Sequence, residues 1–423
     1  MITKIANGIK YWAQLFLLPV YWLSFLFPRD KKIWLFGSTF GRRFADNPRY
    51  FYLYVSQMEN KTMEARGKSK AYVSDLKAIR AIWISHNKKI VELLRSKDYE
   101  AYYYHSLKGI WYCLRGKVYI YDNYSKDISF WLSGGALKFN MWHGIPLKKI
   151  QADNTFDKVR HPRNGWESFK SFPRRLSDEK PSHWVLATSN YIKPIFSSAF
   201  RTKKVSTAGY PRVDGFAYDE IVNVYTATEQ IIIDKIDDML AKRSGSKIIY
   251  YMPTFRDSET QFFDVINLES FNNFLAKNGY IFCAKLHPKS KLKSRFQALE
   301  GENIVIIDAD TDPYVYIPKS SILITDYSSI YFDYLFAEKP ILFFDYDLET
   351  YLKDSREMYF DYEEFTPGVK AATQMELEKA LTEVLEGEDL YQEEREKLKK
   401  KLYDVTDRSI CGDLVDEIRE IIS

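Results

Sequence analysis

Short runs of apolar residues alternate with stretches of helical periodicity along the first half of the chain. Seven runs predict strands: Ile33–Phe36, Ala81–Ile84, Ala101–Tyr104, Val118–Tyr121, Phe139–Trp142, Val185–Ala187 and Val205–Ala208. Between them, stretches such as Lys88–Arg95 and Tyr191–Phe200 have the composition and spacing of helices. Because most of these strands are short apolar runs, we expect them to be buried on both faces of a parallel sheet.

A second alternating pattern follows the turn at Pro211–Gly215. Its predicted strands are Ile248–Met252, Ile281–Ala284, Ile304–Ile307, Ile322–Ile324 and Ile341–Phe344. The Lys- and Glu-rich tail, residues 374–423, predicts helices. A chain of 423 residues exceeds the size at which one hydrophobic core stops growing. We therefore expect an α/β protein with two Rossmann-like domains, over residues 32–215 and 216–423, preceded by a separate segment, residues 1–31.

One stretch interrupts the alternation in the first half. Residues 153–180 are polar and basic, with four large aromatic side chains interleaved: Phe156, Trp166, Phe169 and Phe172. A loop of this length inside a compact domain is uncommon and is often functional. Two interpretations stay open, a segment that meets an acceptor lipid or the membrane surface, and a solvated insertion without a special role.

Four of the predicted strands end in polar or conformationally special residues. These residues are His143 and Gly144, Pro253 and Thr254, Lys285 and His287, and Ser328 and Ser329. In open α/β sheets, ligands bind outside the carboxyl ends of the strands. We therefore expect these strand ends to converge on one cationic cleft that binds an anionic small molecule.

The hydroxyl-rich turn after Ile322–Ile324 predicts a phosphate site. Backbone N–H groups around Ser328 and Ser329 would lie at the start of the following helix, where free donors meet the positive end of the helix dipole. The two hydroxyls would add further donors. In the alternative interpretation, Asp326 and Ser328 only cap that helix.

Five motifs occur in a fixed order along the chain: W-H-G-x-P-L-K-K, G-Y-P-R, Y-x-P-T-F-R-D, K-L-H-P and I-T-D-Y-S-S-I-x-F-D-Y. Together they resemble the CDP-glycerol glycerophosphotransferase family of teichoic acid synthesis, over a region from about Trp34 to Phe360. Residues 36–41 and 43–50 also resemble the primase-like members, which add the first unit to a lipid-linked sugar. Those members have about this length, whereas the polymerising members usually carry a longer N-terminal extension.

The resemblance implies a GT-B arrangement, in which two Rossmann-like domains face each other across a cleft. It also implies attack of an acceptor hydroxyl on the β-phosphorus of CDP-glycerol, with release of CMP. Such a reaction needs a base for the hydroxyl proton and donors for the charge that develops on the leaving phosphate. We expect His143 to be the base and His287, with Lys285, to stabilise the departing CMP. His143 bonding to the pyrophosphate is an alternative.

The remaining residues of the expected site bind the donor. By resemblance, the CDP-glycerol site comprises Gly144, Ile145, Pro146, Leu147, Arg212, Pro253, Thr254, Lys285, Leu286, Ser328, Ser329 and Asp333. Gly144 would allow a close approach of the backbone to the substrate, and Asp333 would bind a glycerol or ribose hydroxyl. Nothing in the sequence demands a metal ion or another cofactor, so Mg²⁺ is expected to be accessory at most.

Two departures from the family pattern leave alternatives open. Ile145 stands where many members have threonine, and Val213 replaces a common asparagine after G-Y-P-R. CDP-ribitol is therefore a second possible donor. A nucleotide-sugar glycosyltransferase of the same two-domain form, and a catalytically idle scaffold, are further alternatives. The absence of G-x-G-x-x-G and of a Walker A motif argues against dehydrogenases and P-loop kinases.

Composition and charge narrow the possible partners. A net charge of +4, without a zinc-finger spacing or a long basic stripe, gives no indication of nucleic-acid binding. The three cysteines, Cys113, Cys283 and Cys411, are far apart in sequence and fit a reducing compartment without a metal site.

The N-terminal segment favours attachment to a membrane. Residues 11–27 contain no charged side chain, are rich in aromatic residues, and are flanked by lysines and Arg29. Pro19 and Gln14 interrupt the apolar run, so we expect a helix that lies in the headgroup region rather than spans the bilayer. The expected location is peripheral, on the cytoplasmic face of the cell membrane, where a polyprenyl-linked saccharide would be the acceptor. A helix that only packs on the protein is the alternative.

Overall fold

The structure, a computed structural model, describes residues 11–65, 79–178, 182–218, 221–256, 259–354, 357–387 and 389–423. Residues 1–10 of the expected membrane segment lie outside this range, as does Asp257 of the third motif. The chain divides into two compact units, each described by itself. Unit 1 comprises residues up to His143, Ile150–Val224 and Asp407–Ser423, and unit 2 comprises Gly144–Lys149 and Tyr225–Thr406.

Unit 1 contains a seven-stranded parallel sheet in the order β3-β2-β1-β4-β5-β6-β7. Its strands are β1 (Asp30–Phe36), β2 (Arg80–Ser85), β3 (Ala101–Tyr103), β4 (Gly116–Tyr121), β5 (Leu137–Asn140), β6 (Trp184–Leu186) and β7 (Val205–Ser206). Its helices include α3 (Asp46–Ala65), α4 (Lys88–Ser96), α5 (Leu107–Arg115), α6 (Gly165–Asp178), α7 (Lys193–Ala199), α8 (Pro211–Ala217) and α18 (Cys411–Ile422). The direction of the order reverses between β1 and β4, which makes this the switch point where ligands bind in such sheets.

Unit 2 repeats the same order with six parallel strands, β10-β9-β8-β11-β12-β13. They are β8 (Lys247–Tyr251), β9 (Tyr280–Lys285), β10 (Ile304–Ile307), β11 (Ile322–Thr325), β12 (Ile341–Phe344) and β13 (Val369–Ala371). The main helices are α9 (Ala227–Lys242), α10 (Thr260–Val265), α11 (Leu268–Asn278), α12 (Leu292–Ala298), α13 (Ile330–Tyr334), α14 (Leu348–Asp354), α15 (Tyr362–Phe365), α16 (Gln374–Glu386) and α17 (Gln392–Leu402). Here the switch point lies between β8 and β11.

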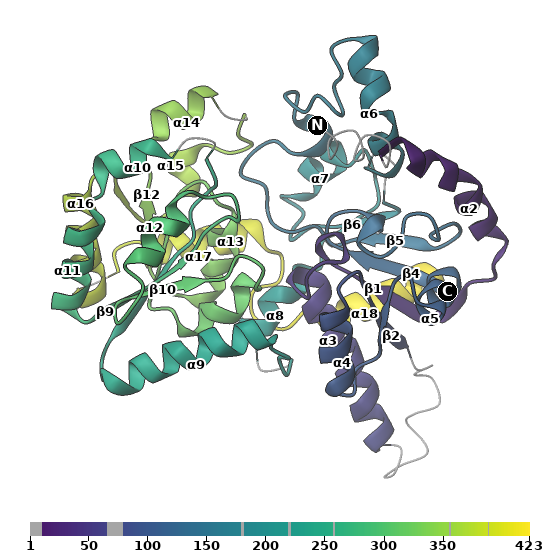
Figure 1. Cartoon of the computed structure of the whole chain (residues 1–423), viewed down its shortest axis with the longest axis horizontal. Helices are drawn as coiled ribbons and strands as arrows, with labels where there is room; N and C mark the ends of the chain where they lie inside the picture. Colours follow the sequence, from purple (N-terminus) through teal and green to yellow (C-terminus); the bar gives the residue numbers. More distant parts are fainter. Residues whose placement is uncertain are drawn as a thin grey trace. The chain divides into compact units, whose positions relative to one another are not determined.

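Burial on both faces explains why the central positions of most strands are apolar. In unit 2, Ile249 and Tyr251 of β8 pack with α10, α11, α12 and α16 in one core cluster, while the intervening Tyr250 is also buried. Figure 1 shows α11 and α16 lying together along the sheet of unit 2. The two parallel α/β sheets that the sequence predicts are confirmed. The expected arrangement of the two domains across a cleft stays a prediction.

Two elements depart from the expected pattern. Strand β13 was not predicted, because it has only three residues and lies at the edge of its sheet. The segment expected as a long loop contains α6, a 14-residue helix with Pro173 inside it. The proline and the polar residues before the helix mask its periodicity, although Trp166, Phe169 and Phe172 recur every three residues.

The last helix does not belong with the domain to which we assigned it. Residues 407–423, expected in the second domain, form part of unit 1. The physical reason is a buried carboxylate in α8: Asp214 accepts hydrogen bonds from the backbone N–H groups of Ile410 and Cys411 and from the hydroxyl of Ser409. Burial raises the pKa of Asp214, against the lowering effect of these bonds. A carboxylate that caps a helix so far along the chain has no sequence signal.

The N-terminal segment is helical and packs on α6. It forms the 3₁₀ turn η1 (Gln14–Leu17), α2 (Leu18–Leu23) and the 3₁₀ turn η2 (Ser24–Leu26). The Tyr11 hydroxyl donates to the carbonyl of Lys170 over 2.8 Å, and the ring of Trp12 stacks on Phe169 with centroids 4.6 Å apart. Figure 1 shows this segment running from α6 along the edge of unit 1. Among the described residues, no helix has both the length and the apolar character needed to cross a bilayer.

Candidate active site

A buried aspartate closes the switch point of unit 1. Asp122 follows β4 directly, is 1% exposed, and accepts a hydrogen bond of 2.6 Å from the hydroxyl of Ser38 after β1. Its other oxygen accepts the backbone N–H of Thr39 over 3.0 Å and the side-chain amide of Asn123 over 2.7 Å. Because the carboxylate bonds both loops, it holds the ends of β1 and β4 together.

A second carboxylate continues this network. Asp127 is fully buried and accepts the backbone N–H groups of Phe40, Asn123 and Tyr124. Burial raises the pKa of Asp127, and the neighbouring charge of Asp122 raises it further. Two carboxyl groups so close together stabilise a local structure only while backbone donors solvate them.

The candidate base His143 lies beside this network with an oriented ring. Its side chain is exposed, its Nδ1 lies 3.1 Å from the carbonyl oxygen of Asp122, and its ring packs on Trp142 with centroids 3.9 Å apart. A carbonyl oxygen can only accept, so Nδ1 must carry the proton. The neutral ring then presents the lone pair of Nε2, which is the state that a general base needs.

The backbone around His143 is held in sparsely populated conformations. Trp142 has φ 52°. Gly144 has φ 145°, a value that residues other than glycine rarely adopt. Thr39 and Phe40, in the loop after β1, also have positive φ values of 49° and 55°. Each such non-glycine residue costs on the order of 1–3 kcal/mol. Strain of this kind concentrates at functional sites, because it fixes a geometry that an unstrained loop would not keep.

Arg212, expected in the donor site, has a structural partner instead. It is 1% exposed at the start of α8, and its guanidinium binds Asp46 of α3 over 2.7 Å. Its backbone N–H also bonds the side chain of Asn47, which in turn donates to the carbonyls of residues 141 and 142. Arg212 therefore supports the turn that carries His143, and the expected contact with CDP-glycerol stays a prediction.

The residues after His143 pack with unit 2. Leu147 accepts the backbone N–H of Tyr359 over 2.9 Å, and the backbone N–H of Lys149 bonds the carbonyl of Glu357 over 2.7 Å. Ile145 and Leu147 are 0% and 2% exposed. Gly144, Ile145, Pro146 and Leu147 are all buried, and their expected contributions to the binding of CDP-glycerol stay predictions.

The switch point of unit 2 is closed in the same way. Asp326 follows β11, is 1% exposed, and accepts the backbone N–H of Thr254 after β8 over 2.8 Å. Its second oxygen pairs with Arg256 at 2.7 Å, and the same guanidinium binds Asp347 after β12 through two bonds of 2.5 and 2.7 Å. Burial lowers the pKa of Arg256, but the two carboxylates raise it more. Arg256 thus joins three neighbouring strand ends.

Sequence reasoning missed this network. Neither Arg256 nor Asp347 is among the site residues that the sequence predicts, because Ile341–Phe344 is the last predicted strand and would be an outer one. Strand β12 is instead flanked by β11 and β13, and Asp347 is 8% exposed. The signal was present in the third motif, where the arginine follows a strand end, but its partners lie 70 and 91 residues further along the chain.

Three residues that we expect to bind CDP-glycerol have hydroxyl groups without a hydrogen bond to other described residues at this edge of the sheet. The hydroxyl oxygen of Thr254 is buried without a hydrogen-bond partner among the described residues. Ser329 is the N-cap residue of α13, yet its hydroxyl makes no cap bond, and Ser328 and Ser329 are both half-buried. A buried hydroxyl without a partner is costly in a folded protein, so such an atom indicates a place for a ligand. The α-helical turn behind the two serines has only five residues, and all of them are buried.

His287 is exposed and has a defined tautomer. Its Nδ1 accepts the backbone N–H of Lys289 over 3.3 Å, and its ring packs on Phe255 with centroids 4.5 Å apart. Because Nδ1 accepts, the proton of the neutral ring is on Nε2. This orientation suits a hydrogen-bond donor, the reverse of His143.

Lys285 and Asp333 have internal partners. The ammonium of Lys285, 6% exposed, donates to the carbonyl of Asp308 over 2.7 Å and to the hydroxyl of Thr311 over 3.2 Å. Asp333 is 1% exposed and accepts the hydroxyls of Tyr314 and Tyr403, each over 2.8 Å. Both side chains therefore hold the fold, and the expected contacts with phosphate and with a donor hydroxyl stay predictions. Leu286 is 4% exposed and Pro253 is half-buried. Neither side chain has a polar group, so both can offer a ligand only apolar surface and backbone atoms.

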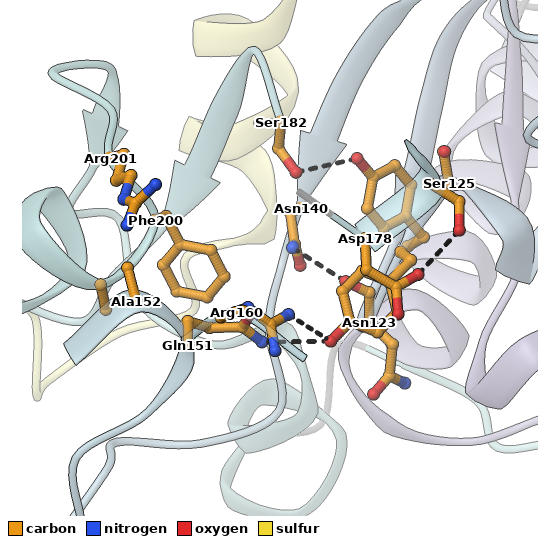
Figure 2. A pocket seen from close by; sticks show the side chains of 14 residues that line it. Asn123, Ser125, Asn140, Gln151, Ala152, Arg160, Asp178, Ser182, Phe200 and Arg201 are labelled. Carbon is orange, nitrogen blue, oxygen red and sulfur yellow. Dashed lines mark hydrogen bonds between the residues drawn. The ribbon is translucent and has the colours of Figure 1, made fainter. Parts of the chain in front are cut away.

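A polar pocket lies at the carboxyl edge of the sheet of unit 1, beside β4 and β5. Figure 2 shows Phe200 and Arg201 on one side of it and Asn123, Asn140 and Asp178 on the other. The hollow measures about 590 Å³ with its open mouth included. Arg160 borders it and bonds the hydroxyl of Tyr124 over 2.9 Å. Among the described residues, no group of three His, Cys, Asp or Glu side chains could hold a metal ion.

A family model described as CDP-glycerol:poly(glycerophosphate) glycerophosphotransferase matches residues 20–420. The chain belongs to this family, and it is therefore an enzyme of the glycerophosphotransferase class, as the ordered motifs indicated.

Curated relatives and a solved structure agree with this assignment. The chain is 30% identical over 361 residues to a teichoic acid poly(glycerol phosphate) polymerase of Bacillus spizizenii, covering 81% of each chain. It is 26% identical to a teichoic acid glycerol-phosphate transferase of Staphylococcus aureus, covering 86% of this chain and 87% of the relative. The solved wall teichoic acid polymerase TagF has the same fold, with a TM-score of 0.70 at 22% identity over 100% of this chain and 98% of that one.

Length does not separate primases from polymerases. The chain spans about half the length of two other curated polymerases that it matches, 46% and 48%. It covers 81% of the Bacillus spizizenii polymerase, however, so a polymerase of similar length exists. The expected primase-like assignment therefore has no support from chain length and stays a prediction.

Replacing Arg256 tests whether the buried carboxylate network holds unit 2 together. The Arg256→Met variant leaves Asp326 and Asp347 buried without their partner, which should lower the free energy of unfolding by about 3–5 kcal/mol. Arg243→Met is the matched control, because Arg243 pairs with Glu302, whose side chain is 86% exposed, and should cost less than about 1 kcal/mol. Urea denaturation followed by circular dichroism measures both. Equal losses in the two variants would contradict the role assigned to Arg256.

Proposed function

We propose that this protein transfers glycerol phosphate from CDP-glycerol to a hydroxyl of a polyprenyl-linked saccharide or polyol-phosphate acceptor, in the synthesis of teichoic acid or a related cell-envelope polymer. The observation that carries the proposal is the hydrogen bond from His143 Nδ1 to the Asp122 carbonyl, in a chain of this family. That bond leaves Nε2 as the only basic atom of an exposed ring next to a strand end. A base in this state is what attack by a hydroxyl requires.

The reaction forms one phosphorus–oxygen bond and breaks another. The acceptor hydroxyl attacks the β-phosphorus of CDP-glycerol, its proton passes to Nε2 of His143, and the bond between the β-phosphorus and the oxygen of CMP breaks. The products are a phosphodiester and CMP. In this proposal Nε2–H of His287 donates to the departing phosphate, whose charge increases as the bond lengthens.

In this proposal, hydroxyl groups of unit 2 that make no hydrogen bond among the described residues bind the phosphates of CDP-glycerol. The buried hydroxyl of Thr254 and the hydroxyls of Ser328 and Ser329 lie after β8 and β11, on either side of the Asp326 carboxylate. They would bind the diphosphate oxygens as neutral donors. Lys285 would supply the positive charge and His287 a further hydrogen bond, with Mg²⁺ accessory at most.

A donor panel tests the activity itself. CMP release from CDP-glycerol, in the presence of lipid-linked acceptor, should exceed release from CDP-ribitol by tenfold or more. A UDP-sugar should not be consumed at all. The measurement is chromatographic quantification of the nucleotide product for the full chain with each donor. Turnover with a UDP-sugar alone would contradict the proposal, and preference for CDP-ribitol would assign the donor to the other polyol.

Amide substitutions separate the two histidine roles. In His143→Asn the amide can replace the Nδ1–H donor toward Asp122 but supplies no base, so kcat should fall by about 10²–10⁴-fold with the fold unchanged. In His287→Gln the amide nitrogen can replace Nε2–H, so this variant should retain at least tenfold more activity than His287→Ala. Exposed His105, changed to Asn, is the control and should keep wild-type kcat.

Two kinetic outcomes would contradict these roles. The first is full activity of His143→Asn. The second is a Gln variant at position 287 that is no better than the Ala variant. If both rings act on one transition state, the double variant should lose far less than the product of the two single losses, because groups that act as a unit are non-additive.

We also propose that the N-terminal segment attaches the protein to the cytoplasmic face of the cell membrane, close to a lipid-linked acceptor. Large apolar side chains are exposed on the N-terminal segment and on α6: Phe16, Leu17, Val20, Trp22, Leu23, Phe25, Leu26, Phe27, Trp166, Phe169 and Phe172. Lys170, beside these rings in α6, offers positive charge to anionic lipid. Aromatic side chains next to basic ones are typical of helices that lie in the headgroup region.

Vesicle sedimentation tests this attachment. Full-length protein should pellet with vesicles of phosphatidylcholine and phosphatidylglycerol, and less with phosphatidylcholine alone. The double variant Phe16→Glu and Leu26→Glu, at positions 85% and 77% exposed, should lose most of this binding without loss of stability. Leu107→Glu, at a position 89% exposed in α5, is the matched control. Equal pelleting of all three proteins would contradict attachment through this segment.

A further inference from the structure

The pocket of unit 1 is joined to His143 through two aromatic rings. Phe200, which lines the pocket, packs edge-on against Trp142 with centroids 4.8 Å apart, and Trp142 packs on His143 at 3.9 Å. Asn140 lines the same pocket and is only three residues before His143, so their backbones are at most about 10 Å apart. The side-chain oxygen of Asn140 accepts the backbone N–H of Trp142 over 2.8 Å. The pocket and the candidate base therefore share a wall.

The lining of this pocket suits a hydroxylated anion. Amide side chains of Asn123 and Gln151 border it together with the hydroxyl of Tyr124. Phe200 offers the apolar surface that the faces of sugars and polyols need. Its one carboxylate, Asp178, is 2% exposed at the side chain and is neutralised by Lys126 at 2.6 Å and by Arg174 at 3.1 Å. It therefore does not repel an anion.

Arg201 supplies an uncompensated positive charge at the mouth of the pocket. Its side chain is exposed, and its guanidinium makes no hydrogen bond or ion pair within the part of the chain that the structure describes. Arg201 also has φ 50°, and Gln151, another lining residue, has φ 49°. Both residues thus keep a conformation that is rare outside glycine. A planar guanidinium is the side chain best suited to a phosphate.

We infer that this pocket binds the acceptor, and that its ligand is a phosphorylated polyol or sugar unit next to the hydroxyl that attacks CDP-glycerol. The inference rests on the proposed function and adds the place where its second substrate binds and the residues that recognise it. Arg201 binds the phosphate, the amides bind hydroxyls, and Phe200 packs on the carbon skeleton. The neighbouring hydroxyl of the same unit then lies within reach of the shared wall and of His143.

The first experiment measures binding of a small probe to the full chain. sn-Glycerol 3-phosphate, titrated calorimetrically, should bind wild-type protein, and its dissociation constant should rise at least tenfold in Arg201→Met. Lys203→Met is the matched control, because Lys203 is an exposed cation two residues further on that does not line the pocket, and it should bind as wild type does. Glycerol, which lacks the phosphate, should show no difference between the three proteins.

The second experiment uses turnover with lipid-linked acceptor. In Arg201→Met the KM for acceptor should rise about tenfold or more, while the KM for CDP-glycerol stays within twofold of wild type. Unchanged probe binding and an unchanged acceptor KM in Arg201→Met would overturn the inference, as would an equal rise in both KM values. If wild-type protein released no CMP from CDP-glycerol, the proposed function would fail, but loss of probe binding in Arg201→Met alone would still support the pocket.

Discussion

A buried aspartate at the switch point of each sheet is the interaction on which the rest of this structure depends. Asp122 after β4 bonds the backbone of Thr39 after β1, and Asp326 after β11 bonds the backbone of Thr254 after β8. Parallel strands end at the same edge without a turn that joins neighbours, so the loops there need another tie. A carboxylate after one of the two strands at the switch point provides it, and His143, Thr254 and Arg256 each bond one of these two residues.

Different groups offset the desolvation free energy of the buried carboxylates at the two sheet edges. Around Asp122 and Asp127 the solvation comes from backbone N–H groups and hydroxyls, and burial together with mutual repulsion raises the pKa of Asp127. Around Asp326 the compensation comes from the Arg256 guanidinium, which Asp347 shares. The first solution leaves a strained polar loop beside an exposed imidazole, which suits proton transfer. The second leaves neutral hydroxyl donors at a rigid edge, which suits holding a diphosphate.

Much of the fold could be predicted, because most strands are buried on both faces and their central positions are therefore apolar. All twelve expected strands occur, and only the three-residue edge strand β13 was missed. The internal partners of the candidate site residues could not be predicted. Lys285 and Asp333 have the right chemistry for a donor site, yet internal partners use their polar groups. Arg256 was left aside, although it joins three strand ends, because its partners are remote in sequence.

By itself, the sequence determined the family, the alternation of strands and helices, and the strand ends at which polar residues gather, since periodicity and ordered motifs are local properties of the chain. Only the tertiary structure decided which of those residues have side chains that bond to buried partners and which have side chains at the surface. It oriented the imidazoles of His143 and His287 oppositely through backbone atoms of Asp122 and Lys289. It also placed α18 in unit 1 and brought together the segments that line the pocket at Arg201. Contacts between such distant segments depend on packing that no local pattern encodes.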